Sequence, residues 1–350
     1  MAAAAGDRAA AQGCESDLDR NGLVSGSDLG ILVGAWGTGG GSTGADLNGD
    51  GTVSGADLGI LVGDWGPCPV PEWANVLAWA PDSAVVTNPS IRAAIGATGL
   101  PWRVEDRRTR IQLVLIPPGT YQRGCSASNS PAGQCAPDEL PVRSVSITRA
   151  FYLGRFEVTQ AQWVAEMPYN PSWFAGLSNH PVESVAASLG DASVATFLVR
   201  TGFRLPTEAE WEYAYRAGTV TAFHGWPTNP SGTNSESQIN MIGWVYSNAC
   251  NGGFMACATN PVGLLRPNGF GLYDMAGNVK ELVSDWYSAN YYSVGGTIDP
   301  TGPGSTPEGY RVFRGGCWGA DASSARASDR GFIAPGSGGW DNGFRVARDP

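Results

Sequence analysis

The sequence predicts an α+β domain preceded by a small all-α module. Two observations predict this division: an oxygen-rich motif occurs twice near the N-terminus, and strand-like and helix-like runs are mixed from Ile111 onward. Many Gly, Asn, Pro and Trp residues lie between those runs, which favours an irregular α+β fold over a sandwich. With 350 residues, 42% of them hydrophobic and 15% charged, the composition is that of a globular protein with a large core and a satellite domain.

The N-terminal motif has the oxygen ladder of a calcium-binding loop. In each copy, oxygen-bearing side chains occupy loop positions 1, 3, 5, 9 and 12, Gly at position 6 makes the sharp turn, and position 7 offers a backbone carbonyl. The expected ligands are Asp17, Asp19, Asn21, Leu23, Ser25 and Asp28 in the first loop, and Asp46, Asn48, Asp50, Thr52, Ser54 and Asp57 in the second. Each loop precedes an apolar run, LGILVGAWG or LGILVGDWG, that fits one helix.

This duplicated EF-hand-like motif resembles the dockerin type I module over residues 14–68, in which one helix follows each loop and position 12 is Asp. The resemblance implies two bound Ca²⁺ ions and, for this module, a cohesin-like or self-association partner. The alternative is that the Asp-rich stretches are solvated turns without metal. Repetition of the whole ligand ladder favours the calcium interpretation.

The cysteines indicate an oxidising compartment. The expected disulfides are Cys14 with Cys68, Cys125 with Cys135, and Cys250 with Cys257, because each pair brackets one loop or module. Cys317 is left over. The competing interpretation is a zinc site, but no CxxC or Cys/His spacing supports it.

Charge and hydropathy exclude two classes of partner. The net charge is −10 and no basic track exists, so we expect no nucleic acid. No apolar run reaches the length of about 18 residues that a membrane span needs. Residues 1–13 are expected to form a disordered tail and lack the apolar core of a signal peptide. We expect a secreted or cell-surface protein whose signal peptide is not part of this sequence.

Residues 69–107 are expected to be a proline-containing linker with one short helix. Residues 67–71 are expected to be extended, and a helix is expected over residues 89–97 with Asn88 as its cap. The large domain is expected over residues 108–350. Within it, IQLVLIPPGTYQRG predicts a strand and turn, FYLGRFEVTQAQW predicts a strand leading into a helix, and VATFLVRTG and TEAEWEYAYRAG predict two further helices.

Five motifs in the large domain occur in the order found in a known family. They are EVTQAQW, FRLPTEAEWEYAYRAG, NGFGLYDMAGNVKEL, RVFRGGCW and NGFRVAR. With them, the domain resembles the formylglycine-generating enzyme family, also called the sulfatase-modifying-factor family. The resemblance implies a C-type-lectin-like fold. The residues expected to form a buried framework rather than a reaction centre are Arg204, Glu208, Glu210, Trp211, Trp318 and Phe344.

The resemblance does not extend to the oxidase site of that family. Its oxidase members bind copper through a cysteine pair that follows the motif matched here by residues 315–318. The matching positions are Ala320 and Ala325, which lack the thiolates that copper(I) prefers. Iron-dependent relatives use three histidines, whereas this chain has only His180 and His224. We therefore predict no catalytic residues; the alternative is a copper- or iron-dependent oxidase with an unrecognised site.

The resemblance also implies calcium within the large domain. The positions that match one family site are Asp274, Gly277, Val279 and Glu281. They would give two carboxylates and two backbone carbonyls, which are ligands for a hard cation. Lys280 stands where the family commonly has Trp, and the alternative is a loop ordered without metal.

The loops near the C-terminus are the expected recognition surface. The segment 319–342 lies between the last two motifs and mixes small residues with single large ones. The predicted ligand contacts are Asp321, Ser323, Asp329, Phe332, Ile333 and Trp340. The residues expected to hold this surface without touching the ligand are Arg314, Gly315, Gly316, Trp318, Gly343 and Phe344. For Phe332 and Trp340 the alternative is burial in the core.

This arrangement resembles the variable proteins of diversity-generating retroelements, which diversify a C-terminal stretch between the same two motifs. The resemblance implies diversification at residues 317–342 and an unknown protein or glycan as the ligand. The sequence therefore predicts a non-catalytic binding protein with a calcium-dependent docking module. A third interpretation is a structural protein anchored through the dockerin-like repeats.

Overall fold

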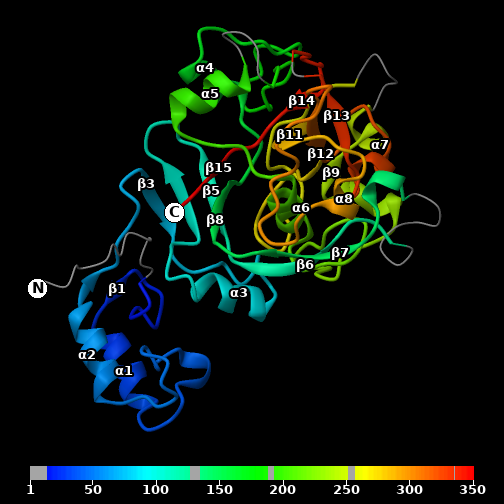
Figure 1. Ribbon diagram of the computed structural model, residues 1–350. Helices are drawn as coiled ribbons and strands as arrows, with labels where there is room; N and C mark the ends of the chain where they lie inside the picture. The colour runs from blue at the N-terminus through cyan, green and yellow to red at the C-terminus, as the bar shows by residue number, and fades with distance from the viewer. Residues whose placement is uncertain (1–13, 127–134, 188–192, 251–256, 335) are drawn as a thin grey trace, which may run out of the picture.

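A computed structural model describes residues 14–126, 135–187, 193–250, 257–334 and 336–350 of the protein. The predicted tail over residues 1–13 lies outside the described residues. Figure 1 shows a small module with α1 and α2 at one end of a larger mixed domain. The α+β class agrees with the sequence prediction.

The small module is two loop–helix repeats closed at their base. Its elements are β1 (Leu23–Val24), α1 (Gly26–Gly34), the 3-10 helix η1 (Gly41–Thr43), α2 (Gly55–Gly63) and β2 (Gly66–Pro67). Both helices begin at a capping box, Ser25 with Asp28 and Ser54 with Asp57, which satisfies the free N–H groups of the first turn. The Cys14–Cys68 disulfide and the antiparallel β1–β2 pair join the two ends of the module. Both predicted helices are therefore confirmed.

A five-stranded sheet forms one side of the large domain. In spatial order its strands are β15 (Ala347–Arg348), β8 (Phe151–Gly154), β5 (Gln112–Ile116), β4 (Arg103–Asp106) and β3 (Ala74–Ala78), all antiparallel to their neighbours. The stretch 69–107 is thus not a linker, because β3 and β4 belong to this sheet. The helix expected there is present as α3 (Pro89–Gly96), with the Asn88 side chain accepting from Ser90 N at 2.9 Å.

A second sheet carries the C-terminal motifs. Its spatial order is β13 (Gly331–Ile333), β12 (Arg311–Arg314), β11 (Lys280–Trp286) and β14 (Asn342–Gly343). Three predicted helices are present as α4 (Gln160–Glu166), α5 (Val194–Thr201) and α6 (Glu208–Arg216). The remaining pairs are β6 (Gly119–Arg123) with β7 (Arg143–Ile147), and β9 (Gly243–Trp244) with β10 (Ala276–Gly277). Short helical turns are η2 (Pro137–Glu139), η3 (Glu236–Met241), α7 (Tyr246–Ala249), α8 (Tyr291–Val294) and η5 (Ala322–Ala325).

A buried ion network links α6 to β6 and to the four-stranded sheet. The side chains of Glu208 and Glu212 are at most 1% exposed and bind arginines from other elements. Arg123 donates to Glu208 at 2.7 Å, Arg330 donates to Glu208 at 2.8 Å, and Arg314 donates to Glu212 at 2.8 Å. Burial alone would raise the pKa of Glu208, but Arg330, Arg123 and Arg314 lower it to about 2. Glu208, Trp211 and Phe344 are buried, as predicted for the framework.

All three expected disulfides are present, and Cys317 is a free, buried thiol. Disulfides persist in oxidising compartments, which indicates a non-cytosolic protein. Among the described residues, every helix is too short or too polar to cross a bilayer.

Candidate functional site

The first predicted calcium loop has its carboxylates gathered. Oxygens of Asp17, Asp19 and Asp28 lie within 4.8 Å of one another. The Asp17 carboxylate accepts from Asn21 N at 3.0 Å and from Gly22 N at 2.7 Å, which folds the loop around it. Burial raises the pKa of Asp17. A gathered, partly buried set of oxygens is a donor set that fits Ca²⁺.

The second loop has the same fold, and one of its carboxylate oxygens is left without a partner. Asp46 Oδ2 accepts from Gly51 N at 2.9 Å, while its buried Oδ1 accepts no hydrogen bond from any described residue. Burial opposes ionisation of Asp57, but backbone N–H groups of Ser54, Asn48 and Leu47 outweigh it and lower its pKa. An orphaned oxygen at loop position 1 also fits a cation, because that position supplies a ligand in such loops.

The site predicted in the large domain is only partly arranged for a metal. Asp274 Oδ2 accepts from Gly263 N at 2.6 Å and its buried Oδ1 has no described partner. Burial raises the pKa of Asp274 to about 6. The carboxylate of Glu281, however, accepts from Arg345 at 2.6 Å and from Trp211 Nε1 at 2.7 Å. Gly277 and Val279 lie on the same turn: Gly277 N donates to Gly315 O and Val279 N donates to Glu157.

The positions that match the oxidase cysteines carry no ligand atoms. The Ala320 carbonyl accepts from Tyr246 N at 2.9 Å, and Ala325 is fully buried with its carbonyl bound by Tyr215 Oη at 2.7 Å. The nearby Cys317 thiol is 4% exposed, and burial raises its pKa to about 11. A thiol held protonated is a poor copper ligand and a poor nucleophile.

Trp340 forms an exposed aromatic pair with a residue that the sequence did not single out. Its ring centroid lies 6.1 Å from that of Trp173, edge to face, and the two residues are 51% and 70% exposed. The prediction that Trp340 faces solvent is consistent with this placement. Trp318 lies at 5% exposure against the Cys250–Cys257 disulfide, as expected for framework.

Buried contacts fix the backbone beneath both indoles. The buried Glu183 carboxylate accepts from Trp173 N at 3.0 Å and Phe174 N at 2.8 Å. On the other side, Ser184 N donates to Gly339 O at 3.1 Å, which ties the two segments together. A Cβ at Gly338 would lie 2.6 Å from Ser184 O, so this close approach requires glycine.

The other two apolar candidates lie together on β13. Phe332 is 49% exposed, yet its ring lies between Tyr287 and Tyr310, with centroids 4.5 and 5.0 Å away. Ile333 is half-buried against the core, opposite Arg311 of β12. Phe332 therefore offers one ring edge rather than a whole ring.

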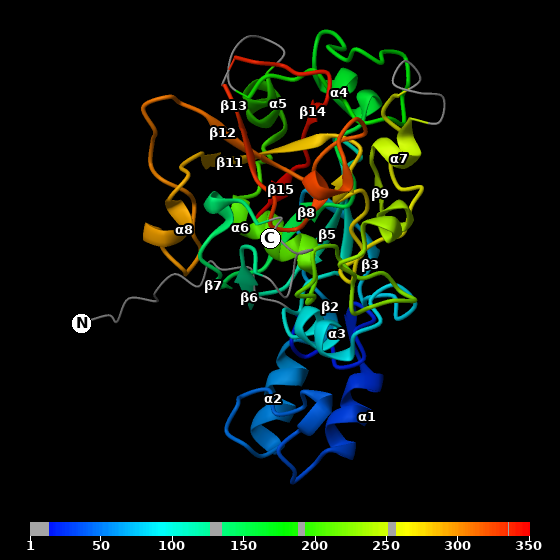
Figure 2. The same ribbon diagram turned by 90° about the vertical axis from the view of Figure 1, so that its right-hand side faces the viewer.

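Asp321 and Ser323 line a polar hollow on another part of the surface. Its volume is about 510 Å³. The hollow lies among η3, α7 and η5, and its walls are formed by Glu236, Ser237, Asn240, Tyr246, Ser247, Asp321, Ala322 and Ser323. Figure 2 shows α7 and β9 on the side away from α8.

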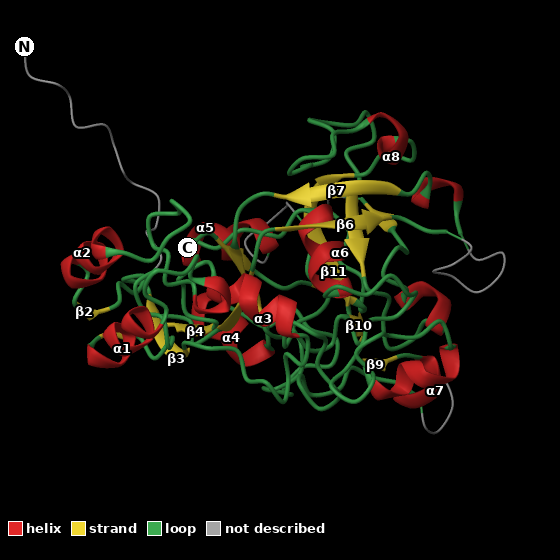
Figure 3. Cartoon of the chain, turned by 90° about the horizontal axis from the view of Figure 1, so that it is seen from below, coloured by secondary structure: helices red, strands yellow, loops and turns green. Residues whose placement is uncertain are grey.

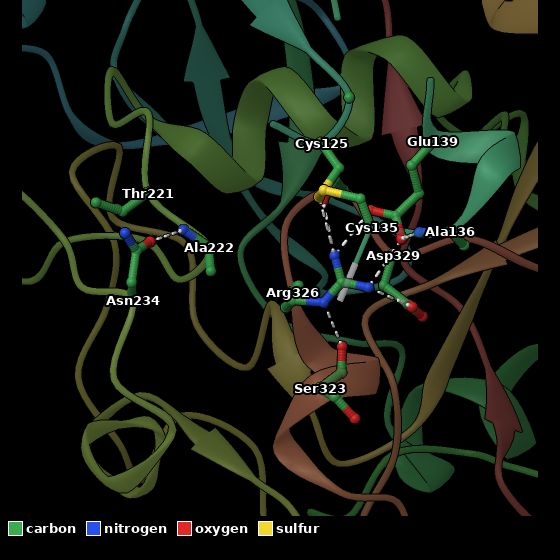
Figure 4. Close-up of a disulfide and its surroundings, with 12 residues drawn as sticks. Cys125, Cys135, Ala136, Glu139, Thr221, Ala222, Asn234, Ser323, Arg326 and Asp329 are labelled. Carbon is green, nitrogen blue, oxygen red and sulfur yellow. Dashed lines mark hydrogen bonds and ion pairs between the residues drawn. A yellow bond between two sulfur atoms is a disulfide. The ribbon is translucent and has the colours of Figure 1, made fainter. Parts of the chain in front are cut away.

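Asp329 serves the framework more than the surface. It accepts from Arg326 at 3.2 Å, and burial raises its pKa to about 6. Figure 4 shows Arg326 beside the Cys125–Cys135 disulfide, held by Glu139 and donating to the Ser323 carbonyl at 2.8 Å. The six predicted contacts therefore fall in separate places rather than in one cluster. Arg326 and Trp173 were missed because only tertiary contacts reveal their roles.

The antiparallel five-stranded sheet, the mixed four-stranded sheet and the long connecting loops define a protein of the C-type-lectin-like, formylglycine-generating-enzyme-like class. The sulfatase-modifying factor enzyme 1-like domain matches residues 101–350, and the chain belongs to this family. The chain is similar to two solved structures at this level. It resembles Treponema denticola variable protein 1 with 28% identity and a TM-score of 0.54, covering 69% of this chain and 95% of that one. It resembles PvdO from Pseudomonas aeruginosa with 27% identity and a TM-score of 0.58, covering 71% and 98%.

Curated relatives include enzymes. The formylglycine-generating enzyme of Streptomyces coelicolor is 39% identical over 178 residues, which is 50% of this chain and 54% of that enzyme. The enzyme of Mus musculus is 38% identical over 177 residues, which is 49% of this chain and 45% of that enzyme. The chain thus spans about half the length of these relatives.

Proposed function

We propose that this protein is a secreted or surface-displayed, non-catalytic binding protein that recognises a protein or glycan through loops on a C-type-lectin-like scaffold. The observation that carries the proposal is the exposed Trp173–Trp340 pair. Exposed indoles desolvate much apolar area on binding, and Trp is enriched among residues that dominate binding energy. The buried Glu183 carboxylate and the carbonyl of the half-buried Gly339 hold the backbone beneath both rings, so less backbone entropy is lost on binding.

The absence of catalysis is supported by the chemistry of the matched positions. Ala320 and Ala325 offer no thiolate, and Cys317 keeps its proton at neutral pH. The similarity to formylglycine-generating enzymes favours a copper-dependent oxidase as a second candidate. The likeness to a variable protein supports recognition instead, and it supports the idea that residues 317–342 are diversified.

The N-terminal module is proposed to bind two Ca²⁺ ions and to dock the protein to a partner. The gathered oxygens of the first loop and the orphaned Asp46 oxygen of the second support this part. Their carboxylates would hold the ions, and the ions would neutralise charge that otherwise repels within each loop.

Binding should be tested with paired variants on immobilised glycans and on extracellular proteins. We expect a ligand that the native chain retains and the Trp173→Ala/Trp340→Ala variant loses. Val199→Ala is the matched control, because Val199 is 85% exposed and lies on α5. Equal retention by all three proteins would place recognition elsewhere on the molecule.

A further inference from the structure

The two calcium loops are near-copies in sequence but lie in different surroundings. The first loop contacts the large domain, whereas the equivalent glycine of the second loop has no such neighbour. A Cβ at Gly22 of the first loop would lie 2.1 Å from Trp79 Nε1. At the equivalent Gly51 of the second loop, no described atom comes within 4 Å of such a Cβ apart from the adjoining residues.

Trp79 links the first loop to the sheet of the large domain. It follows β3, and its carbonyl accepts from Trp102 N at 2.9 Å, next to β4. Its indole packs against the apolar core of the small module. Figure 3, viewed from below, shows α1 next to α2, the other helix of this module. One side chain of the large domain thus completes the core of the calcium module.

Arg20 makes a second contact from the same loop. Its Nη1 donates to Arg92 O of α3 at 3.3 Å, and a Cβ at Gly96 would lie 1.6 Å from that nitrogen. The cation therefore lies in the last turn of α3, where backbone carbonyls favour positive charge. Arg20 adopts a left-handed φ of 60°, a conformation that the second loop reaches with Gly49 at 71°. Arginine accepts this strain only in the loop that touches the large domain.

The proposed metal ligand and the docking contact meet at one residue, Gly22. Asp17, at loop position 1, accepts a hydrogen bond from Gly22 N, and the Trp79 indole packs against Gly22. The Gly22 carbonyl also accepts from Cys68 N at 3.0 Å, beside the module's exit toward β3. A cation that fixes the Asp17 carboxylate would also fix the peptide against which Trp79 packs.

We infer that the first calcium loop is an interdomain site, whose Ca²⁺ locks the small module onto the large domain through Trp79 and Arg20, while the second loop serves the module alone. This inference rests on the calcium binding proposed above. Coupling of this kind is reciprocal: docking must raise the calcium affinity of the first loop by the same factor as calcium favours docking.

The test uses the full chain. Hydrogen exchange of residues 79–99 should slow when CaCl₂ replaces EGTA, both in the native chain and in Asp46→Asn, but not in Asp17→Asn. Calorimetric calcium titration should show that Trp79→Ala weakens the first loop about fivefold or more and leaves the second unchanged. Arg20→Gly, which restores the residue type of the second loop, should weaken the first loop in the same direction without removing core packing.

Trp65→Ala is the matched control for Trp79→Ala, because Trp65 follows α2 and is 51% exposed. The protein could bind two calcium ions while Asp17→Asn and Asp46→Asn change hydrogen exchange of residues 79–99 equally. That result would overturn the coupling but not the calcium sites. The coupling would also be overturned if the first loop kept its calcium affinity in both the Trp79→Ala and the Arg20→Gly variants. No calcium binding by the native chain would overturn both the coupling and the proposed calcium module.

Discussion

At the scale of single residues, solvent exposure separates the proposed recognition side chains from framework side chains. Trp318 ends one motif and Trp340 lies in the segment that follows it, yet one is 5% exposed and the other 51%. Trp318 packs edge to face with Phe174 at 5.5 Å and covers a disulfide. Trp340 contacts chiefly another exposed indole. The same residue type therefore has opposite energetic roles.

Thermal unfolding should reveal this contrast. Trp318→Ala should lower the free energy of unfolding by about 3–5 kcal/mol, because it removes a buried ring and leaves a cavity. Trp340→Ala should lower it by less than about 1 kcal/mol. If calorimetry gives similar losses for the two variants, Trp340 is core and the recognition site is misplaced.

Asp285 makes stability depend on pH. Burial first, and then the nearby Glu208, raise the pKa of Asp285 from 3.8 to about 7. The folded state thus prefers the protonated acid. The resulting contribution of Asp285 to the free energy of unfolding is complete below about pH 4 and is lost as the pH rises through 7. Between pH 5 and 8 the free energy of unfolding of the native chain should fall by on the order of 2 kcal/mol more than that of the Asp285→Asn variant. Denaturant melts with parallel pH profiles for the two proteins would contradict this.

At the scale of elements, local patterns predicted the helices and tertiary pairing decided the rest. The sequence predicted Asn88 as a helix cap, and the structure shows Ser25 and Ser54 capping two further helices. The strands β3 and β4 were missed because their short runs, ANVLA and RVED, become strands by pairing with each other and with β5. Likewise, nothing local connects Trp173 with Trp340, since their contact depends on the fold.

Metal removal should act on the small module first. In scanning calorimetry, EGTA should lower the melting temperature of the transition that includes residues 14–68, because unneutralised carboxylates repel one another within each loop. Asp17→Ala and Asp46→Ala should each remove one calcium equivalent in titration. Identical melting with and without chelator would show that the Cys14–Cys68 bond, the capping boxes and the apolar core suffice without metal.

At the scale of the whole molecule, the fold is more predictable from sequence than the ligand surface. The fold could be predicted from five ordered motifs, and two of these motifs contain the framework residues Glu208 and Arg314, which form a buried ion pair. The ligand surface could be predicted only as a region, because side chains from segments 172–174 and 338–341 meet there by folding.

The enzymatic alternative has a direct assay. A sulfatase-type peptide incubated with this protein, copper and oxygen should keep its cysteine, with no aldehyde detectable by hydrazide labelling and mass spectrometry. A formylglycine-generating enzyme assayed in parallel is the positive control. Aldehyde formed at a rate proportional to protein concentration would establish an oxidase that works without the usual cysteine pair.

The position of the small module also sets which way the protein faces. Figures 1 and 2 both place α1 and α2 at one end of the molecule and α4 with β14 at the other. The Trp173–Trp340 pair lies next to β14, whereas Trp79 and Arg20 brace the opposite end. A protein tethered by its small module would therefore present the Trp173–Trp340 pair at the end farthest from the point of attachment. Loss of the Trp79 and Arg20 contacts would let the large domain rotate relative to the module. The aromatic pair would then sample more orientations and reach ligands over a wider area, with less fixed geometry.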